Sequence, residues 1–291
     1  MGTDGRSGGL HAGLEAGREF LRSWQALDRW VPREELGDVG GLPEILDFAD
    51  SVIELSGDDS VSVARLGDGE LGLATGATVP NNGCQAADPE LREALQRVLR
   101  CDNPKCRVAL PKSFFFRDPT CTSEEVDSFV RDAFAPQYKA GDYGKYIVRG
   151  YRYLDASMSV VRRHYPDLGR RVYDAYYAIV RGMLHGRDVM VVSGDSRFLE
   201  YENSLLGDSG ARSVLPLVVP QRDAWGLYKA IKKRIMDLNE SGDRLVLLGC
   251  GPTATVLAYE LSDRMRCLDV GHMFGDYNLA MGGAGIGAFW A

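Results

Sequence analysis

The sequence lacks the features that mark membrane, secreted and nucleic-acid-binding proteins. No apolar run approaches the length of a membrane span, and the first residues contain no apolar signal-peptide segment. Basic residues are fewer than acidic ones, 34 against 41, which gives a formal net charge of −7. Proteins that bind nucleic acid usually present a basic surface. We therefore expect a cytoplasmic protein with no membrane span and no nucleic-acid partner.

Paired cysteine knuckles of the CxxC type are also missing. The chain has six cysteines, and four of them fall between positions 84 and 121. Those four leave a zinc site open, but their spacing is not that of the common zinc-binding motifs. Buried, reduced thiols are the favoured interpretation for a cytoplasmic protein. The cysteines are Cys84, Cys101, Cys106, Cys121, Cys250 and Cys267.

What the sequence does contain is an alternation of short apolar strands and helices. Its 291 residues, 45% of them hydrophobic, suffice for a sizeable buried core. The run at residues 188–193 is continuously apolar, as in parallel strands that are covered on both faces. The pattern predicts an α/β fold with a Rossmann-like, doubly wound, mostly parallel sheet. Strands are predicted at residues 61–66, 107–110, 188–193, 214–219 and 244–248, and helices at 43–55, 89–100, 123–138, 154–184, 225–238 and 252–265.

Three segments are expected along the chain. Residues 1–41 form an N-terminal segment, disordered at residues 1–9 and then an amphipathic helix with Phe20, Trp24 and Leu27 at helical spacing. This helix is expected to pack on the main domain or on a second subunit, as a candidate homodimer contact. The main domain is expected at residues 42–280. The Gly-rich tail, residues 281–291, is interpreted either as a frayed terminus or as a lid over the site.

The most informative stretch is V-S-V-A-R-L-G-D-G-E-L at residues 61–71. An apolar strand there breaks at Gly67 and is followed by two carboxylates. If the backbone stays extended, Asp68 and Glu70 lie on one face, where a cation would relieve their repulsion. Hard oxygen ligands of this kind suit Mg²⁺ or Mn²⁺ bound to substrate phosphates. The alternative is an Asp-Gly turn followed by a solvated glutamate.

A second stretch, G-C-G-P-T-A-T at residues 249–255, joins a strand to a helix. Gly251 relieves the turn, and Thr253 and Thr255 place hydroxyls near the helix start. A helix N-terminus with free amide groups favours a phosphate or diphosphate. Read alone, the stretch is similar to the glycine loop of S-adenosylmethionine-dependent methyltransferases, but that loop normally opens its fold, whereas this one follows most of the predicted strands. A tight turn without a ligand is the remaining interpretation.

Residues 193–197 and 269–272 also follow predicted strands directly. Ligands of doubly wound sheets bind beyond the carboxyl ends of the strands, so these residues are expected to meet the two stretches above. Asp269 is a candidate for binding ribose or accepting a proton, and His272 for orienting a phosphate or donating a proton. Each also has a purely structural interpretation. The other histidines are interpreted as surface residues: His11, His164 and His185.

Four motifs resemble one family in their order and spacing. They are R-L-G-D-G-E (65–70), V-S-G-D-S-R (192–197), L-G-C-G-P-T-A-T-V-L-A-Y-E-L (248–261) and D-V-G-H-M-F-G-D-Y (269–277). Together they resemble the GT-D-fold glycosyltransferases, formerly DUF1792, over residues 52–277. The resemblance implies a Rossmann-like hexosyltransferase that moves a sugar from a nucleotide sugar, such as UDP-glucose, to a hydroxyl of a glycan, glycopeptide or small-molecule natural product. It also implies a divalent cation, Mn²⁺ or Mg²⁺, as cofactor.

The resemblance assigns some of the roles, and besides the metal motif it carries Arg65, Ser196 and Arg197 into the site. Its metal motif falls on Asp68 and Glu70. If transfer inverts the anomeric centre, a base must take the acceptor's proton, and a retaining enzyme needs no such base. The candidate bases are Asp269 and His272, ahead of Asp195 and Glu202. The candidate donor-binding residues are Arg65, Gly67, Ser193, Ser196, Arg197, Gly251, Thr253 and Thr255.

Some segments depart from the family pattern. Residues 141–153 and 198–203 match poorly, and the N-terminal helix and the tail have no evident counterpart. Because such segments are expected to contact the acceptor, its identity stays open. Two rival functions also remain, a methyltransferase that uses the loop at residues 249–251 and a non-catalytic nucleotide-binding protein.

Overall fold

A computed structural model of the chain describes residues 5–25, 30–37, 41–76, 85–140, 143–194 and 203–283, with side chains in the first helix described from residue 12 to 24. Some residues named above lie outside the described part. They are Leu27, Cys84, Asp195, Ser196, Arg197, Glu202 and the tail from residue 284 onward.

The fold is built on a parallel sheet of eight strands within the described residues. All pairings between its strands are parallel, and a separate antiparallel pair joins β1 (Val31–Pro32) to β5 (Phe116–Arg117). The strand order confirms the predicted Rossmann-like, mostly parallel sheet. Across the sheet the strands are β2 (Glu44–Ile45), β6 (Arg152–Asp155), β4 (Cys106–Leu110), β3 (Ser62–Arg65), β10 (Cys267–Asp269), β9 (Leu245–Gly249), β7 (Asp188–Ser193) and β8 (Ser213–Val218).

The sheet has a hydrophobic core on each face because side chains alternate along its strands. In β7, Met190 and Val192 enter one core, and Val189 and Val191 enter the other. All four are fully buried, which explains why this strand reads as a continuous apolar run.

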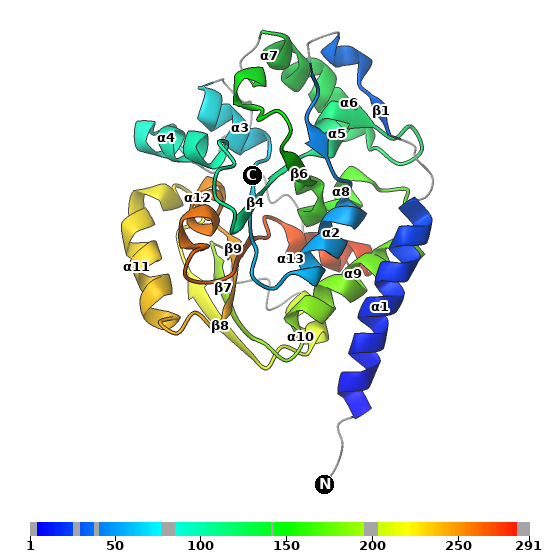
Figure 1. The fold of residues 1–291 in the computed structure, drawn as a ribbon, viewed down its shortest axis with the longest axis vertical. Coiled ribbons are helices and arrows are strands. Elements are labelled where there is room, and N and C mark those ends of the chain that lie inside the picture. Colours follow the sequence, from blue (N-terminus) through cyan, green and yellow to red (C-terminus); the bar gives the residue numbers. More distant parts are fainter. Residues whose placement is uncertain are drawn as a thin grey trace.

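Helices cover both faces, so the sheet is doubly wound as predicted (Figure 1). One core includes side chains of α3 (Asp68–Thr75), α4 (Pro89–Val98), α5 (Lys112–Phe115), α6 (Glu124–Phe129), α7 (Ala135–Lys139), α11 (Tyr228–Leu238) and α12 (Pro252–Leu261). The other includes side chains of α1 (Gly5–Gln25), α2 (Phe48–Gly57), α8 (Val161–His164), α9 (Arg170–Leu184), α10 (Leu205–Ser209) and α13 (Met273–Ala280). No helix in the described part is long and apolar enough to cross a membrane.

Two predicted helices are wrong in part. The one expected at residues 43–55 begins as strand β2, and α2 starts only at Phe48, where the Asp47 carboxylate accepts hydrogen bonds from the amides of Ala49 and Asp50. The one expected at residues 154–184 contains strand β6 and two separate helices, α8 and α9. The break before α9 falls at Gly169, whose φ of +81° does not continue a helix.

The N-terminal helix packs on the domain itself. Leu14 and Leu21 of α1 are buried, and Gly17 lies so close to α9 that an added Cβ would come within 2.7 Å of the Ala175 carbonyl oxygen. The helix starts at Gly5, so the disorder predicted for residues 1–9 is wrong from that residue on. The buried face of α1 is therefore used within the chain, and a homodimer contact stays a prediction.

Candidate active site

The order in which the chain adds strands to the sheet reverses between β3 and β10. After β3 the chain proceeds to β4 and β6 on one side, whereas β7, β8 and β9 lie on the other, beyond β10. Open α/β sheets bind ligands at such a switch point, outside the carboxyl ends of the strands. Here those ends are Arg65 and Asp269.

Asp269 is a buried carboxyl group that holds the ends of both strands together. Only 4% of it is exposed. Its Oδ2 accepts a hydrogen bond from the Arg65 amide at 3.4 Å, and its Oδ1 accepts one from the Gly271 amide at 3.2 Å. The Arg65 Nε lies 4.0 Å from Oδ1. Protein groups thus surround this carboxyl group. Its contacts with the amide and the guanidinium hold Arg65 in place.

The hydroxyl of Thr255 is a hydrogen-bond partner of Asp269 in either protonation state of the carboxyl group. Its Oγ1 lies 2.8 Å from the Arg65 carbonyl oxygen and 2.9 Å from Asp269 Oδ2, yet one hydroxyl proton serves one acceptor at a time. When Thr255 donates to the carbonyl, a protonated Asp269 can donate to Thr255. Burial raises the pKa of Asp269 to about 7, against the charge of Arg65 and with help from the charge of Glu70.

The guanidinium of Arg65 lies across two glycines. A Cβ at Gly271, where φ is +48°, would come within 2.9 Å of Nε, and one at Gly67 would come within 3.2 Å of Nη1. Within the described residues the guanidinium makes no hydrogen bond, and its Nε is buried. Since buried polar groups normally have partners, this cation is suited to an anionic ligand.

The two acidic residues after β3 do not lie on an extended strand. Asp68 and Glu70 occupy the first turn of α3, and the Glu70 carboxylate accepts a hydrogen bond from the Gly67 amide at 2.8 Å. Residues two apart on a helix point about 200° apart, so the predicted shared face is wrong. The chain turns into a helix here because a carboxylate that caps the free amides stabilises the first turn.

The two carboxylates after β3 are hard oxygen donors of the kind that divalent cations bind. Asp68 is partly exposed, and Glu70, although buried, has a second oxygen beside the one that caps Gly67. The described residues contain no group of three or more His, Cys, Asp or Glu that could hold a metal, so neither a cysteine zinc site nor an all-protein cage is found there. Mg²⁺ and Mn²⁺ often use one or two carboxylates together with substrate phosphates.

The start of α12 faces the same edge of the sheet. Gly251, with φ +62°, is exposed and has open space where a Cβ would be, so a ligand can approach the first amides of the helix. Thr253 and Thr255 are fully buried. The Thr255 hydroxyl serves Arg65 and Asp269, whereas the Thr253 hydroxyl has no hydrogen-bond partner within the described residues.

Two more predicted residues border this edge. Ser193 ends β7, and its hydroxyl lies 3.8 Å from where a Cβ of Gly249 would stand. His272 is exposed at the start of α13. Partial desolvation, and then the charges of Arg65 and Arg163, lower the pKa of His272.

One residue of this edge was not identified from the sequence. His164, interpreted as a surface residue, is half-buried, and its Nδ1 lies 2.9 Å from the Ser157 hydroxyl. The Asp276 carboxylate accepts hydrogen bonds from the amides of Arg162 (2.9 Å) and Arg163 (3.1 Å), which fixes the helix that carries His164. Asp276 belongs to the motif at residues 269–277, and an acidic residue in this mostly apolar stretch was the signal that the sequence offered.

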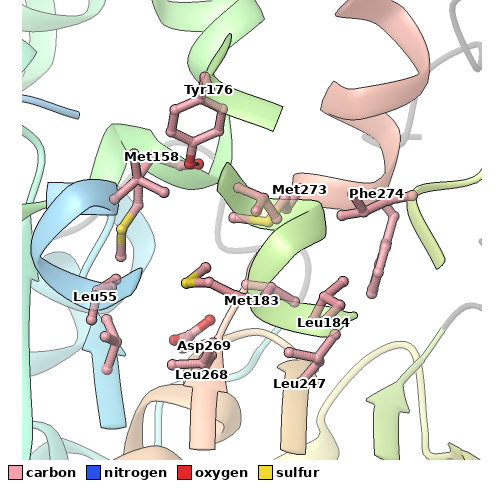
Figure 2. Close-up of a pocket in the computed structure, with 15 residues that line it drawn as sticks. Leu55, Met158, Tyr176, Met183, Leu184, Leu247, Leu268, Asp269, Met273 and Phe274 are labelled. Atoms are coloured by element: carbon pink, nitrogen blue, oxygen red, sulfur yellow. Dashed lines mark hydrogen bonds between the residues drawn. The ribbon is translucent and has the colours of Figure 1, made fainter. Parts of the chain in front are cut away.

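An apolar cavity of the second core lies between strands β3, β9 and β10 and the helices that cover them, and Asp269 is part of its lining (Figure 2). Its volume is about 30 Å³, which is roughly the space of one water molecule. Sites for small organic ligands are at least ten times larger, so this cavity is a packing space and not a site for a large substrate. Its lining includes Leu55, Met158, Met183, Leu184 and Phe274.

An arginine, two carboxylates and a helix N-terminus at the switch point of an open α/β sheet are the features expected in the class of proteins that bind phosphorylated ligands. The family model for the glycosyltransferase GT-D fold matches residues 63–284. The chain belongs to this family, as the four motifs indicated.

Proteins with similar sequences are also named as glycosyltransferases. The chain is 30% identical to a probable glycosyl transferase Gly of Streptococcus gordonii over 225 residues, and 27% identical to the glycosyltransferase GlyD of Streptococcus pneumoniae over 254 residues. Those matches cover 77% and 84% of this chain but only 31% and 28% of the relatives, so the chain spans about a third of their length.

Solved structures show the same fold. A glycosyltransferase (DUF1792) from Streptococcus sanguinis superposes with a TM-score of 0.70 at 28% identity, covering 83% of this chain and 86% of that one. A second structure, described as a domain of unknown function 1792 with a distinct glycosyltransferase fold, gives a TM-score of 0.69 at 24% identity and covers 82% of each chain.

Proposed function

We propose that this chain is a metal-dependent glycosyltransferase that takes its sugar from a UDP-sugar. The observation that carries the proposal is Arg65, whose guanidinium makes no hydrogen bond within the described residues and stands at the switch point beside the acidic first turn of α3. Nucleotide-sugar cleavage develops negative charge on the leaving diphosphate, and fixed cations at that point stabilise it. Family membership supports the same reaction class.

Each residue of the site has a separate role in this proposal. Asp68 and Glu70 would hold Mn²⁺ or Mg²⁺, which when bound neutralises the leaving diphosphate. Arg65 binds a phosphate oxygen, and the first amides of α12, after Gly251, point at the remaining charge. Gly67 lets Arg65 lie close to the backbone. Contacts of the donor with Ser193, Thr253, Ser196 and Arg197 stay predictions, as does a cytoplasmic location.

The two predicted bases differ in what they can reach. Asp269 is enclosed by Arg65, Thr255 and Gly271, so we assign it the role of holding Arg65 in place. His272 is exposed, and it can meet a ligand at the rim. The acceptor, which we propose is a hydroxyl of a glycan, peptide or small molecule, would approach from outside the strand ends.

Calorimetry of UDP binding with and without MnCl₂ tests the metal and donor assignments. We expect Mn²⁺ to tighten binding to the wild-type protein, and Asp68→Asn combined with Glu70→Gln to abolish that effect, since the glutamine keeps an oxygen for the Gly67 amide. Glu90→Gln, in the first turn of α4, is the matched control and should bind as the wild type does. A double variant that still binds UDP more tightly with Mn²⁺ would contradict the assignment.

A thermal-shift panel separates the rival functions. A ligand that binds only the folded state raises the melting temperature. We expect stabilisation by a UDP-sugar with Mn²⁺ and none by S-adenosylmethionine. Stabilisation by S-adenosylmethionine alone would favour the methyltransferase. Stabilisation by UDP-sugars without release of UDP or transfer to any acceptor would favour a binding protein.

A further inference from the structure

The imidazole of His164 stands between two buried serine hydroxyls. Its Nδ1 lies 2.9 Å from Ser157 Oγ and 3.2 Å from Ser113 Oγ. Ser113 follows the carboxyl end of β4, and Ser157 follows that of β6. Both serines are fully buried. The ring is therefore held at the same edge of the sheet as Arg65, over the neighbouring strands.

The hydroxyls continue to a buried carboxylate. The Tyr165 phenol lies close to the hydroxyls of Ser157 and Ser113, which act on its pKa. Tyr165 in turn donates to Asp155 Oδ2 at 3.2 Å. The other oxygen of Asp155 accepts the amides of Lys112 at 2.9 Å and Ser157 at 2.8 Å. Every group around Asp155 is thus a donor.

This carboxylate sets the direction of the whole chain of hydrogen bonds. An ionised Asp155 only accepts, so Tyr165 points its proton there and leaves the lone pairs of its oxygen towards the serine hydroxyls. The Nδ1 of His164 then carries a proton and donates it to a serine, which leaves a lone pair on Nε2. Within the described residues Nε2 has no hydrogen-bond partner and is not buried. An imidazole fixed at one nitrogen and open at the other is the usual form of a catalytic base.

The position of His164 fits the acceptor side of the site. Arg65 and Arg163 act electrostatically on both His164 and His272, so the two imidazoles border one region. The strand order puts β4 and β6 on one side of β3, and β10 and β9, which carry Gly271 and the start of α12, on the other. A donor whose diphosphate lies towards β9 and β10 therefore leaves the space over β4 and β6 for the acceptor.

We propose that His164, positioned by Ser157, Tyr165 and Asp155, is the base that takes the proton from the acceptor hydroxyl. This rests on the proposed function above. The acceptor oxygen bonds to the anomeric carbon while its proton passes to Nε2. The bond from that carbon to the diphosphate oxygen breaks, and its electron pair leaves with UDP. The imidazolium then gives its proton to water.

The charge around the ring is compatible with this role. Burial, and then the charges of Arg163 and Arg65, lower the pKa of His164 to about 3, so the ring is neutral but only weakly basic in the free protein. The negative diphosphate of a bound donor pairs with Arg65 and favours the imidazolium, so the proton affinity rises when the substrate arrives.

The test measures UDP release from a panel of UDP-sugars with Mn²⁺ and water as the acceptor. For His164→Ala we expect kcat to fall by about 100-fold or more, with KM for the donor and the affinity for UDP unchanged. Added imidazole should restore part of the rate, which a purely structural role would not allow. His164→Gln keeps a side chain between the serines and gives the same test if the alanine variant is unstable. His185→Ala is the matched control, since that half-buried histidine lies beside Ser209 and should turn over normally.

A second variant tests the link from His164 through Tyr165 to Asp155. Tyr165→Phe keeps the ring but breaks the link to Asp155, and we expect kcat to fall by about 10-fold at unchanged KM. Wild-type turnover in His164→Ala, or a loss rescued by imidazole in His272→Ala instead, would overturn this assignment alone. A wild-type protein that neither binds UDP nor releases it from any sugar of the panel would contradict the proposed function, and this assignment with it.

Discussion

At the scale of single residues, the placement of Arg65 depends on a glycine beside it. An alanine at Gly271 adds a Cβ within 2.9 Å of the guanidinium and must adopt φ near +48°. The left-handed conformation alone costs a non-glycine residue about 1–2 kcal/mol. We expect Gly271→Ala to lose about that much stability in urea unfolding and to bind UDP at least about tenfold more weakly by calorimetry, because Arg65 is displaced. Gly169→Ala, with φ +81° and open space around it, should lose stability but bind UDP normally.

Two buried threonines of α12 offer a matched comparison. Thr255 uses its hydroxyl on Arg65 and Asp269, whereas the Thr253 hydroxyl is buried without a partner. Leaving a buried acceptor unpaired costs about 1–3 kcal/mol, so Thr255→Val should destabilise the protein by that order. Thr253→Val removes an unpaired group and should be neutral or stabilising. Equal losses in chemical denaturation of the two variants would contradict this distinction.

At the scale of secondary-structure elements, the close packing of α1 on α9 can be tested at two glycines of α1. Gly17→Ala puts a Cβ within 2.7 Å of the Ala175 carbonyl oxygen, so α1 must move away, and we expect a loss of about 1–3 kcal/mol. Gly13 lies on the same helix with nothing within 4 Å, and Gly13→Ala should stabilise by about 0.5–1 kcal/mol. Thermal unfolding of both variants checks this. A stable Gly17→Ala protein would mean that α1 does not pack as described.

The elements also show what the sequence could and could not predict. Strands such as β7 and β3 were predictable because a short apolar run allows few other structures, and the end of β3 located Arg65, whereas β2 and β6 lie in segments that were predicted as helices. The turn of Asp68 into α3 was not, because a Gly-Asp-Gly run suits a helix start and an extended end equally well. His164 was missed for a different reason. Its partners Ser113 and Ser157 are 51 and 7 residues away, and only the sheet brings them together.

At the scale of the whole molecule, buried carboxyl groups make stability depend on pH. Burial raises the pKa of Asp155 and Asp276 to about 6 and that of Asp269 to about 7, compared with about 3.9 in an unfolded chain. Between the unfolded and the folded pKa values, the folded protein therefore binds more protons than the unfolded one. The free energy of unfolding that these carboxyl groups contribute falls as pH rises through that window. The lowered pKa of His164 acts in the opposite direction below pH 6.5. The pH dependence of wild-type stability therefore combines opposing contributions, so the contribution of a single carboxyl group must be measured separately.

Asp276 can be isolated by comparing Asp276→Asn with the wild type in urea unfolding from pH 4 to pH 8. The asparagine loses hydrogen bonds from Arg162, Arg163 or Tyr177, so the variant is less stable throughout. As pH rises, only the wild type loses the stability that its protonated carboxyl contributes. The difference in free energy of unfolding between wild type and variant should therefore narrow by about 2–3 kcal/mol between pH 4 and pH 7. Asp174→Asn, an exposed carboxylate on α9, is the control, and its gap should stay constant. A gap for Asp276→Asn that widens with pH would mean that the three donors outweigh burial and hold this carboxylate ionised.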